Sequence, residues 1–158
     1  MYARRWLRLL VRRAPFDTGT TAVNRAERFR GARILVIEDE PQVRAFIIRV
    51  LQLEGAAVVA ASTGAAGLAS IRDDGPFHLV TLDLRLPDIS GWDVLDAIRA
   101  RHPTQAECHV VILSASEDGE NRTLAAAQNA AFVTKPVGAR DLVDAISPFI
   151  QEAFGRQG

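Results

Sequence analysis

The sequence predicts an α/β protein built around a doubly wound, five-stranded parallel sheet. Five short apolar runs alternate along the chain with five segments of helical periodicity, which is typical of a parallel sheet with helices on both faces. The runs are apolar at every position rather than at every second one, as strands buried on both faces require. The 158 residues make up about one domain.

Polar residues follow directly after several of the predicted strands. The strands are expected at residues 34–37, 56–61, 79–82, 110–113 and 131–133. Glu38, Asp83 and Ser114 come directly after the first, third and fourth of them. In a doubly wound sheet with the strand order 2-1-3-4-5, ligands bind beyond the carboxyl ends of the strands, where the order reverses. We therefore expect these side chains to line one edge of the sheet.

Helical spacing follows each predicted strand. After the first strand, apolar residues at positions 43, 46, 47, 50 and 51 lie on one face of a helix. Pro41 suits the first position of this helix, and Gly55 ends it. Two further helices are expected at about 62–74 and 119–129. Another is expected around the apolar residues Trp92, Leu95 and Ile98. The last is expected over the apolar positions 142, 146, 149 and 150.

The composition excludes several classes of protein. With 48% hydrophobic and 24% charged residues, the chain has a globular rather than a disordered composition. A single cysteine, Cys108, excludes a disulfide framework and a multi-cysteine metal site. No stretch approaches 18 apolar residues, so the sequence predicts no membrane-spanning helix.

The formal net charge of zero conceals two oppositely charged parts. Residues 1–31 hold eight arginines and two acidic residues, a net charge of +6, whereas residues 32–158 hold 11 basic and 17 acidic residues, a net charge of −6. We interpret 1–31 as a basic extension and linker before an acidic domain at 32–158. Three interpretations of the extension stay open: a solvated tail, a helix over 2–13 that contacts anionic lipid or nucleic acid, or part of a larger architecture.

The expected sheet edge has the chemistry of a phosphoryl site. Glu38, Asp39 and Asp83 would repel one another, by about 1 kcal/mol per pair at 4 Å in water and roughly 4 kcal/mol at an effective dielectric of 20. Oxygen-rich clusters of this kind suit Mg²⁺. Lys135, the only lysine of the chain, lies just past the fifth strand and adds a positive charge. Such groups can stabilise a phosphoryl group in transfer, and a carboxylate among them can serve as nucleophile.

The chain resembles a response-regulator receiver domain of two-component signalling, of the stand-alone, chemotaxis-regulator type. The resemblance covers residues 33 to about 152 and is carried by four stretches in the expected order, at 34–41, 82–91, 111–115 and 132–136. It implies the flavodoxin-like receiver fold. The spacings between Asp39, Asp83, Ser114 and Lys135 fit the family.

The resemblance implies a phosphoacceptor and a metal site. Asp83 would accept a phosphoryl group from a phosphohistidine of a partner kinase. Mg²⁺ is the implied cofactor, and its ligands would be Glu38, Asp39, Asp83 and the backbone carbonyl of Arg85. Glu38 stands where the family more often has Asp, and its longer side chain can still reach the ion.

The resemblance also implies a switch. Ser114 and Lys135 would bind the phosphoryl oxygens, Phe132 would turn inward on activation, and the bond before Pro136 would be cis. Two departures concern the helices. Asn129 stands where the family usually has alanine after glycine and can adopt a left-handed backbone. Pro148, inside the last helix, is expected to kink or shorten it.

The partners implied are a histidine kinase or phosphotransfer protein and a downstream protein target, in the cytoplasm. Because only four residues follow residue 154, we expect no DNA-binding output domain. Contact with lipid or nucleic acid through 1–31 and a homodimer stay open. We expect no enzyme in the usual sense, only a protein that catalyses its own phosphorylation and dephosphorylation.

Two other classes of function are alternatives to a phosphorylation-controlled switch. A protein-binding module of the receiver type could work without phosphorylation, although intact acidic, hydroxyl and lysine positions argue against it. A phosphohydrolase with Asp83 as nucleophile is the other. The haloacid-dehalogenase-type hydrolases carry a second aspartate two residues after the nucleophile, and this chain has Arg85 there.

Overall fold

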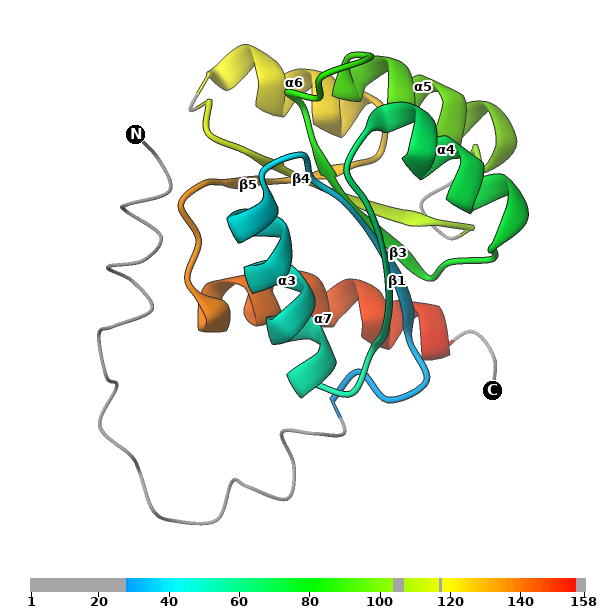
Figure 1. Ribbon diagram of the computed structural model, residues 1–158, viewed down its shortest axis with the longest axis vertical. Helices are drawn as coiled ribbons and strands as arrows, with labels where there is room; N and C mark the ends of the chain where they lie inside the picture. Colours follow the sequence, from blue (N-terminus) through cyan, green and yellow to red (C-terminus); the bar gives the residue numbers. More distant parts are fainter. Residues whose placement is uncertain (1–27, 104–106, 117, 156–158) are drawn as a thin grey trace.

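The computed structural model describes residues 28–103, 107–116 and 118–155 (Figure 1). Its five strands pair in parallel in the order β2-β1-β3-β4-β5. They are β1 (Arg33–Ile37), β2 (Ala57–Ala61), β3 (Leu79–Asp83), β4 (His109–Ser114) and β5 (Ala131–Thr134). The predicted fold class and the predicted strand order are both confirmed.

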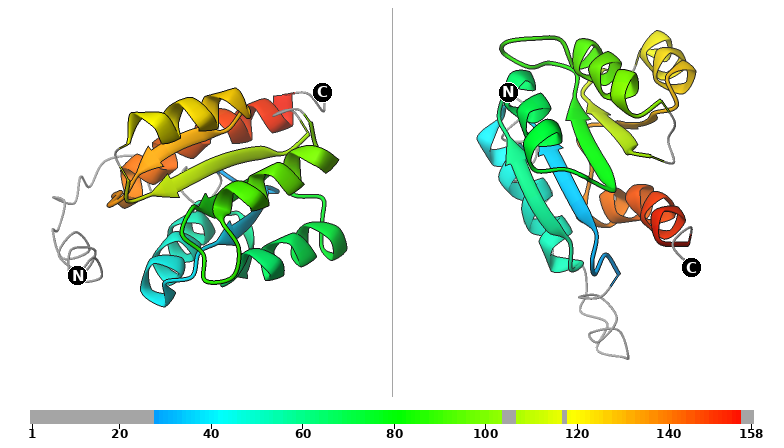
Figure 2. Two further views of the ribbon diagram at one scale, coloured as in Figure 1. Left: turned by 90° about the horizontal axis from the view of Figure 1, so that it is seen from above. Right: turned by 90° about the vertical axis from the view of Figure 1, so that its right-hand side faces the viewer.

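Helices cover both faces of the sheet. They are α3 (Pro41–Leu53), α4 (Gly64–Asp73), α5 (Gly91–Arg101), α6 (Gly119–Ala127) and α7 (Ala139–Gly155). α3 and α7 lie on one face, and α4, α5 and α6 lie on the other (Figures 1 and 2). No helix in the described part of the chain has both the length and the apolar character needed to cross a bilayer.

The core is divided by the sheet into two apolar layers. Along β1, Ile34 and Val36 face α3 and α7, whereas Leu35 and Ile37 face the other helices, and all four are buried. Each such side chain contributes about 1.5–3 kcal/mol through burial. This two-sided burial explains why the strands are apolar at every position.

The ordered packing begins before residue 32. Phe29 is fully buried in the layer under α3 and α7, and its N–H donates to the Glu54 carbonyl at 2.7 Å. Arg28 lies beside Glu54, with 3.6 Å between Nε and Oε2. The end of the segment that we assigned to the extension is therefore part of the domain's packing. The helix expected at 2–13 lies outside the described residues.

The last two helices differ in extent from the prediction. α7 continues through Pro148 to Gly155, so Pro148 does not shorten the helix, and the kink that was the alternative stays a prediction. Pro148 is exposed, whereas Ile150 is buried in the apolar layer on this face of the sheet and Phe154 packs against the same layer, which holds the final turns. α6 ends at Ala127, before the expected residue 129, and Asn129 adopts the left-handed backbone (φ 52°) that its side chain tolerates.

Candidate functional site

Three carboxylates converge at the carboxyl edge of the sheet. Glu38 and Asp39 follow β1, and Asp83 is the last residue of the neighbouring β3. One oxygen of each carboxylate lies within 4.8 Å of the others. Glu38 and Asp83 are 2% and 8% exposed, whereas Asp39 is exposed to solvent. The sequence-based expectation that strand ends would bring these residues together agrees with this geometry.

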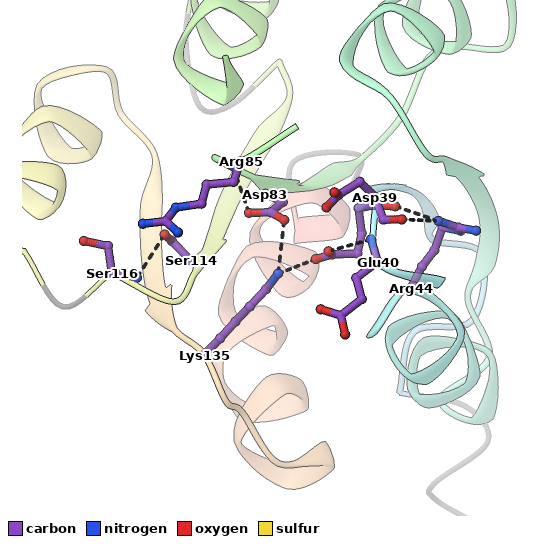
Figure 3. A network of polar contacts seen from close by, with 9 residues as sticks. Asp39, Glu40, Arg44, Asp83, Arg85, Ser114, Ser116 and Lys135 are labelled. Carbon is purple, nitrogen blue, oxygen red and sulfur yellow. Dashed lines mark hydrogen bonds and ion pairs between the residues drawn. The ribbon is translucent and has the colours of Figure 1, made fainter. Parts of the chain in front are cut away.

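The Lys135 ammonium lies between two of the carboxylates (Figure 3). Its Nζ contacts Oε2 of Glu38 and lies 3.4 Å from Oδ2 of Asp83. The Lys135 N–H donates to the Ser114 carbonyl at 2.7 Å, which fixes the residue just past β5. The cluster thus holds three carboxyl groups and one ammonium, so the site carries more negative than positive charge when the carboxyl groups are ionised.

The pKa of Glu38 is raised, chiefly because its carboxyl group is buried. Burial and, to a smaller extent, the Asp83 carboxylate together raise the pKa of Glu38 to about 7, although the Lys135 ammonium lowers it. A nearby divalent cation favours the ionised form of such a carboxyl group. A metal ion bound at this site would therefore release a proton from Glu38 near neutral pH.

The donor set fits Mg²⁺. Carboxylate oxygens are the hard ligands that this ion prefers, and the exposed Asp39 leaves one side of the cluster open for the water molecules that Mg²⁺ retains. Main-chain groups orient two of the carboxylates: the Arg85 N–H donates to Oδ1 of Asp83 at 3.1 Å, and the Glu40 N–H donates to Oε1 of Glu38 at 3.3 Å. The Arg85 carbonyl as a fourth ligand stays a prediction.

The loop after Asp83 is held at both ends. Gly91 donates its N–H to the Leu84 carbonyl at 3.0 Å, and a Cβ at this position would lie 2.4 Å from the Asp83 carbonyl oxygen. Only glycine allows this approach. Further along, the Asp88 carboxylate accepts the N–H groups of Gly64 and Ala65 at the start of α4, and these bonds lower the pKa of Asp88.

The remaining residues of the predicted set lie around this cluster. Ser114 ends β4, is 2% exposed, and its Oγ accepts the Ser116 N–H at 3.3 Å (Figure 3). Phe132 is partly buried against the apolar layer under α4, α5 and α6 rather than among the polar groups. The Lys135–Pro136 peptide bond is cis. The roles of Ser114 and Phe132 in switching stay predictions.

Two arginines near the site were missed by sequence reasoning. Arg44, on α3, donates to the carbonyls of Glu38 and Asp39. Arg122, on α6, donates to Oγ1 of Thr134 at 2.7 Å and lies over the Phe132 ring, 5.0 Å from its centroid. The position of Arg44 one turn after the acidic pair could have indicated its contact, whereas nothing in the local sequence indicates that of Arg122.

The fold and the site together define a class. A parallel sheet of this strand order with an acidic cluster at its carboxyl edge is a CheY-like domain of flavodoxin-like fold. The family model of the response regulator receiver domain matches residues 34–147. The chain therefore belongs to the response-regulator receiver domain family, as the resemblance predicted.

Curated relatives contain this domain within longer chains. The transcriptional regulatory protein KdpE of Mycobacterium tuberculosis H37Rv is 40% identical over 106 residues, which are 66% of this chain and 45% of that protein. The sensor protein TorS of Escherichia coli K12 is 30% identical over 148 residues, 92% of this chain and 16% of that protein. The chain thus spans less than half the length of these relatives.

Solved structures of receiver domains match over nearly their whole length. A CheY-like receiver domain protein from Methanospirillum hungatei JF-1 has 29% identity and a TM-score of 0.71, and the match covers 80% of this chain and 98% of that one. A receiver domain protein from Clostridium thermocellum has 33% identity and a TM-score of 0.67, over 80% and 96% of the two chains.

Proposed function

We propose that this receiver domain is a phosphorylation-controlled switch that accepts a phosphoryl group on Asp83. The donor is a phosphohistidine of a histidine kinase or of a phosphotransfer protein. The position of the Asp83 carboxylate supports this most strongly, because it lies among two further carboxylates and 3.4 Å from the Lys135 ammonium. Glu38 also lies in this cluster and contacts Lys135, and what distinguishes Asp83 is its match to the phosphoacceptor position that the family resemblance implies.

The transfer step follows from the chemistry of the cluster. An Asp83 carboxylate oxygen attacks phosphorus, an O–P bond forms, and the P–N bond to imidazole breaks with its electron pair retained by the leaving nitrogen. Mg²⁺, when bound, neutralises charge on the phosphoryl oxygens. The Lys135 ammonium, already beside Oδ2 of Asp83, pairs with a phosphoryl oxygen. The Ser114 hydroxyl, at the end of the adjacent β4, donates to another.

The consequence of phosphorylation is a change of partner-binding surface. Added charge at Asp83 draws Ser114 toward the phosphoryl group, and β4 and β5 are paired beside it through Ser114 and Thr134. Covalent charge that biases a two-state element is a general switching device. The output is contact with a downstream protein or a second copy of the chain, in the cytoplasm. The protein acts on no separate substrate, since the chemistry takes place on its own aspartate.

Phosphorylation with acetyl phosphate, or with a phosphorylated kinase, in the presence of Mg²⁺ tests the proposal. The wild-type protein should gain one phosphoryl group, measured by radiolabel or intact mass, and Asp83→Asn should gain none while it keeps its fold. Asp93→Asn, a substitution on α5, is the matched control and should label normally. Label retained by Asp83→Asn would show that the phosphoacceptor is assigned wrongly.

Two other outcomes point to the competing functions. A folded wild-type protein that takes no label from acetyl phosphate or from any kinase tested would indicate a binding module that works without phosphorylation. Continuous turnover of a small phosphate ester would indicate a phosphohydrolase. We do not expect the first outcome, because the acidic, hydroxyl and lysine positions of the site are intact. We do not expect the second, because Arg85 stands where such a hydrolase needs a second acid.

A further inference from the structure

We infer that Arg44 is a positioning residue for the metal site, an inference that rests on the proposed function of that site. Its guanidinium reaches back from α3 to the loop that carries the acidic pair (Figure 3). Nη1 donates to the Glu38 carbonyl at 2.9 Å and to the Asp39 carbonyl at 3.2 Å. One side chain thus holds the backbone of both acidic residues after β1.

The position of the Arg44 charge is informative. A guanidinium beside an acidic cluster would ordinarily pair with a carboxylate, and Arg is well suited to such bidentate pairs. No carboxylate of the described residues forms an ion pair with Arg44, and both of its side-chain hydrogen bonds go to main-chain carbonyls. Arg44 therefore does not compete with a cation for the carboxylate oxygens of Glu38 and Asp39.

The Glu38 N–H donates to the Ala61 carbonyl at 3.1 Å, but beyond Glu38 the loop has few restraints other than Arg44. Glu40, the residue before α3, makes no side-chain capping hydrogen bond, and Pro41 after it has no N–H to donate. The Glu40 N–H bonds to Oε1 of Glu38 at 3.3 Å, and this bond competes with metal for the same carboxylate.

Asp39 has the least support of the three acidic residues. Its carboxylate is exposed, and no hydrogen bond among the described residues reaches it. Its direction is therefore set by its backbone, which Arg44 holds. Groups that orient metal ligands in this way are typically worth about 10–100-fold in metal affinity.

Mg²⁺ titration of two variants, Arg44→Gln and Arg44→Lys, tests the inference by calorimetry. Neither the shorter Gln nor the shorter Lys places a donor where Nη1 of Arg44 meets the two carbonyls, so both variants should bind Mg²⁺ about tenfold more weakly. A purely electrostatic role gives the opposite pattern, because Arg44→Gln would then bind Mg²⁺ more tightly and Arg44→Lys would be unchanged. Arg49→Gln, which removes an exposed arginine from the same helix, is the control and should bind as the wild type does.

Amide exchange in metal-free protein provides a readout that does not need the ion. The N–H groups of Asp39 and Glu40 should exchange faster in both Arg44 variants, while those of β4 stay unchanged. Wild-type affinity in Arg44→Lys together with unchanged exchange overturns the inference. A wild-type protein that binds no Mg²⁺ contradicts the proposed function instead, and the exchange rates still decide whether Arg44 holds the loop.

Discussion

Glu38 is the site residue whose chemistry depends most on its surroundings. Its side chain is longer than the aspartate common at this position in the family, yet its carboxylate reaches the same cluster as Asp39 and Asp83. The added length lets it contact Lys135 from the end of β1 while remaining buried. Burial also raises its pKa to about 7, so its charge changes within the neutral range.

Mg²⁺ binding should therefore weaken as the pH falls through 7. Above about pH 7 the Glu38 carboxylate is ionised and available to the metal, whereas below it a proton must be displaced. The affinity should fall by up to about tenfold per pH unit in the acidic range, because each pH unit changes the proton competition by that factor. Calorimetric titration across the neutral range measures this.

Glu38→Gln is the control for this pH dependence. Glutamine keeps the length and one oxygen donor but cannot ionise, so the variant should bind Mg²⁺ more weakly and lose most of the pH dependence. A wild-type affinity that is the same at about pH 6 and pH 8 contradicts the assignment of this titration to Glu38.

Thr81 offers a second prediction at a single residue. It lies on β3 two residues before Asp83, is 1% exposed, and its Oγ1 has no hydrogen-bond partner among the described residues. A buried hydroxyl without a partner costs free energy that an isosteric methyl group does not. Thr81→Val should raise the free energy of unfolding by about 1 kcal/mol in urea denaturation. A loss of stability would show that the hydroxyl is satisfied in solution.

Among the elements, α5 and α6 are joined by one long side chain. Arg99, near the end of α5, donates to four main-chain carbonyls at distances between 2.8 and 3.3 Å. Two of these carbonyls follow α6, at Gln128 and Asn129, one belongs to His102 after α5, and one to Cys108 before β4. A single guanidinium therefore satisfies carbonyls that helix ends leave without partners.

Arg99→Lys should destabilise the fold almost as much as Arg99→Ala, by about 2–4 kcal/mol. An ammonium retains the charge but lacks the planar set of donors that reaches four carbonyls. Urea denaturation measures the loss. Arg101→Ala, at the exposed end of the same helix, is the matched control and should change stability little. Wild-type stability in Arg99→Lys would mean that the charge alone suffices.

The strand ends were predictable because they depend on local sequence. Glu38, Asp83 and Ser114 follow directly after apolar runs, and the geometry of a parallel sheet then places them at one edge. Contacts such as those of Arg99 with the carbonyls after α6 and of Arg122 with Thr134 were not predictable in this way. Each depends on where a long side chain ends after two elements have packed, which no periodicity in the sequence encodes.

In the whole molecule, the two edges of the sheet differ: the candidate site lies at one, and the residues before β1 pack near the other. The acidic cluster lies at the carboxyl ends of the strands, whereas Phe29 and Arg28 pack before the amino end of β1. Sequence reasoning set the domain boundary at residue 32 because the net charge of the chain changes sign there and the regular strand and helix pattern begins just after it. The burial of Phe29 depends on tertiary packing against α3 and α7, and a lone aromatic residue in a polar segment does not reveal it.

The most direct measurement of the central claim is to map the modified residue. The protein, phosphorylated in the presence of Mg²⁺, is reduced with borohydride, which converts an aspartyl phosphate into homoserine, and its peptides are sequenced by mass spectrometry. We expect homoserine at position 83 and at no other position, and no conversion when Mg²⁺ is chelated before phosphorylation. Conversion at a different residue, or none in a folded protein that binds Mg²⁺, would contradict the claim.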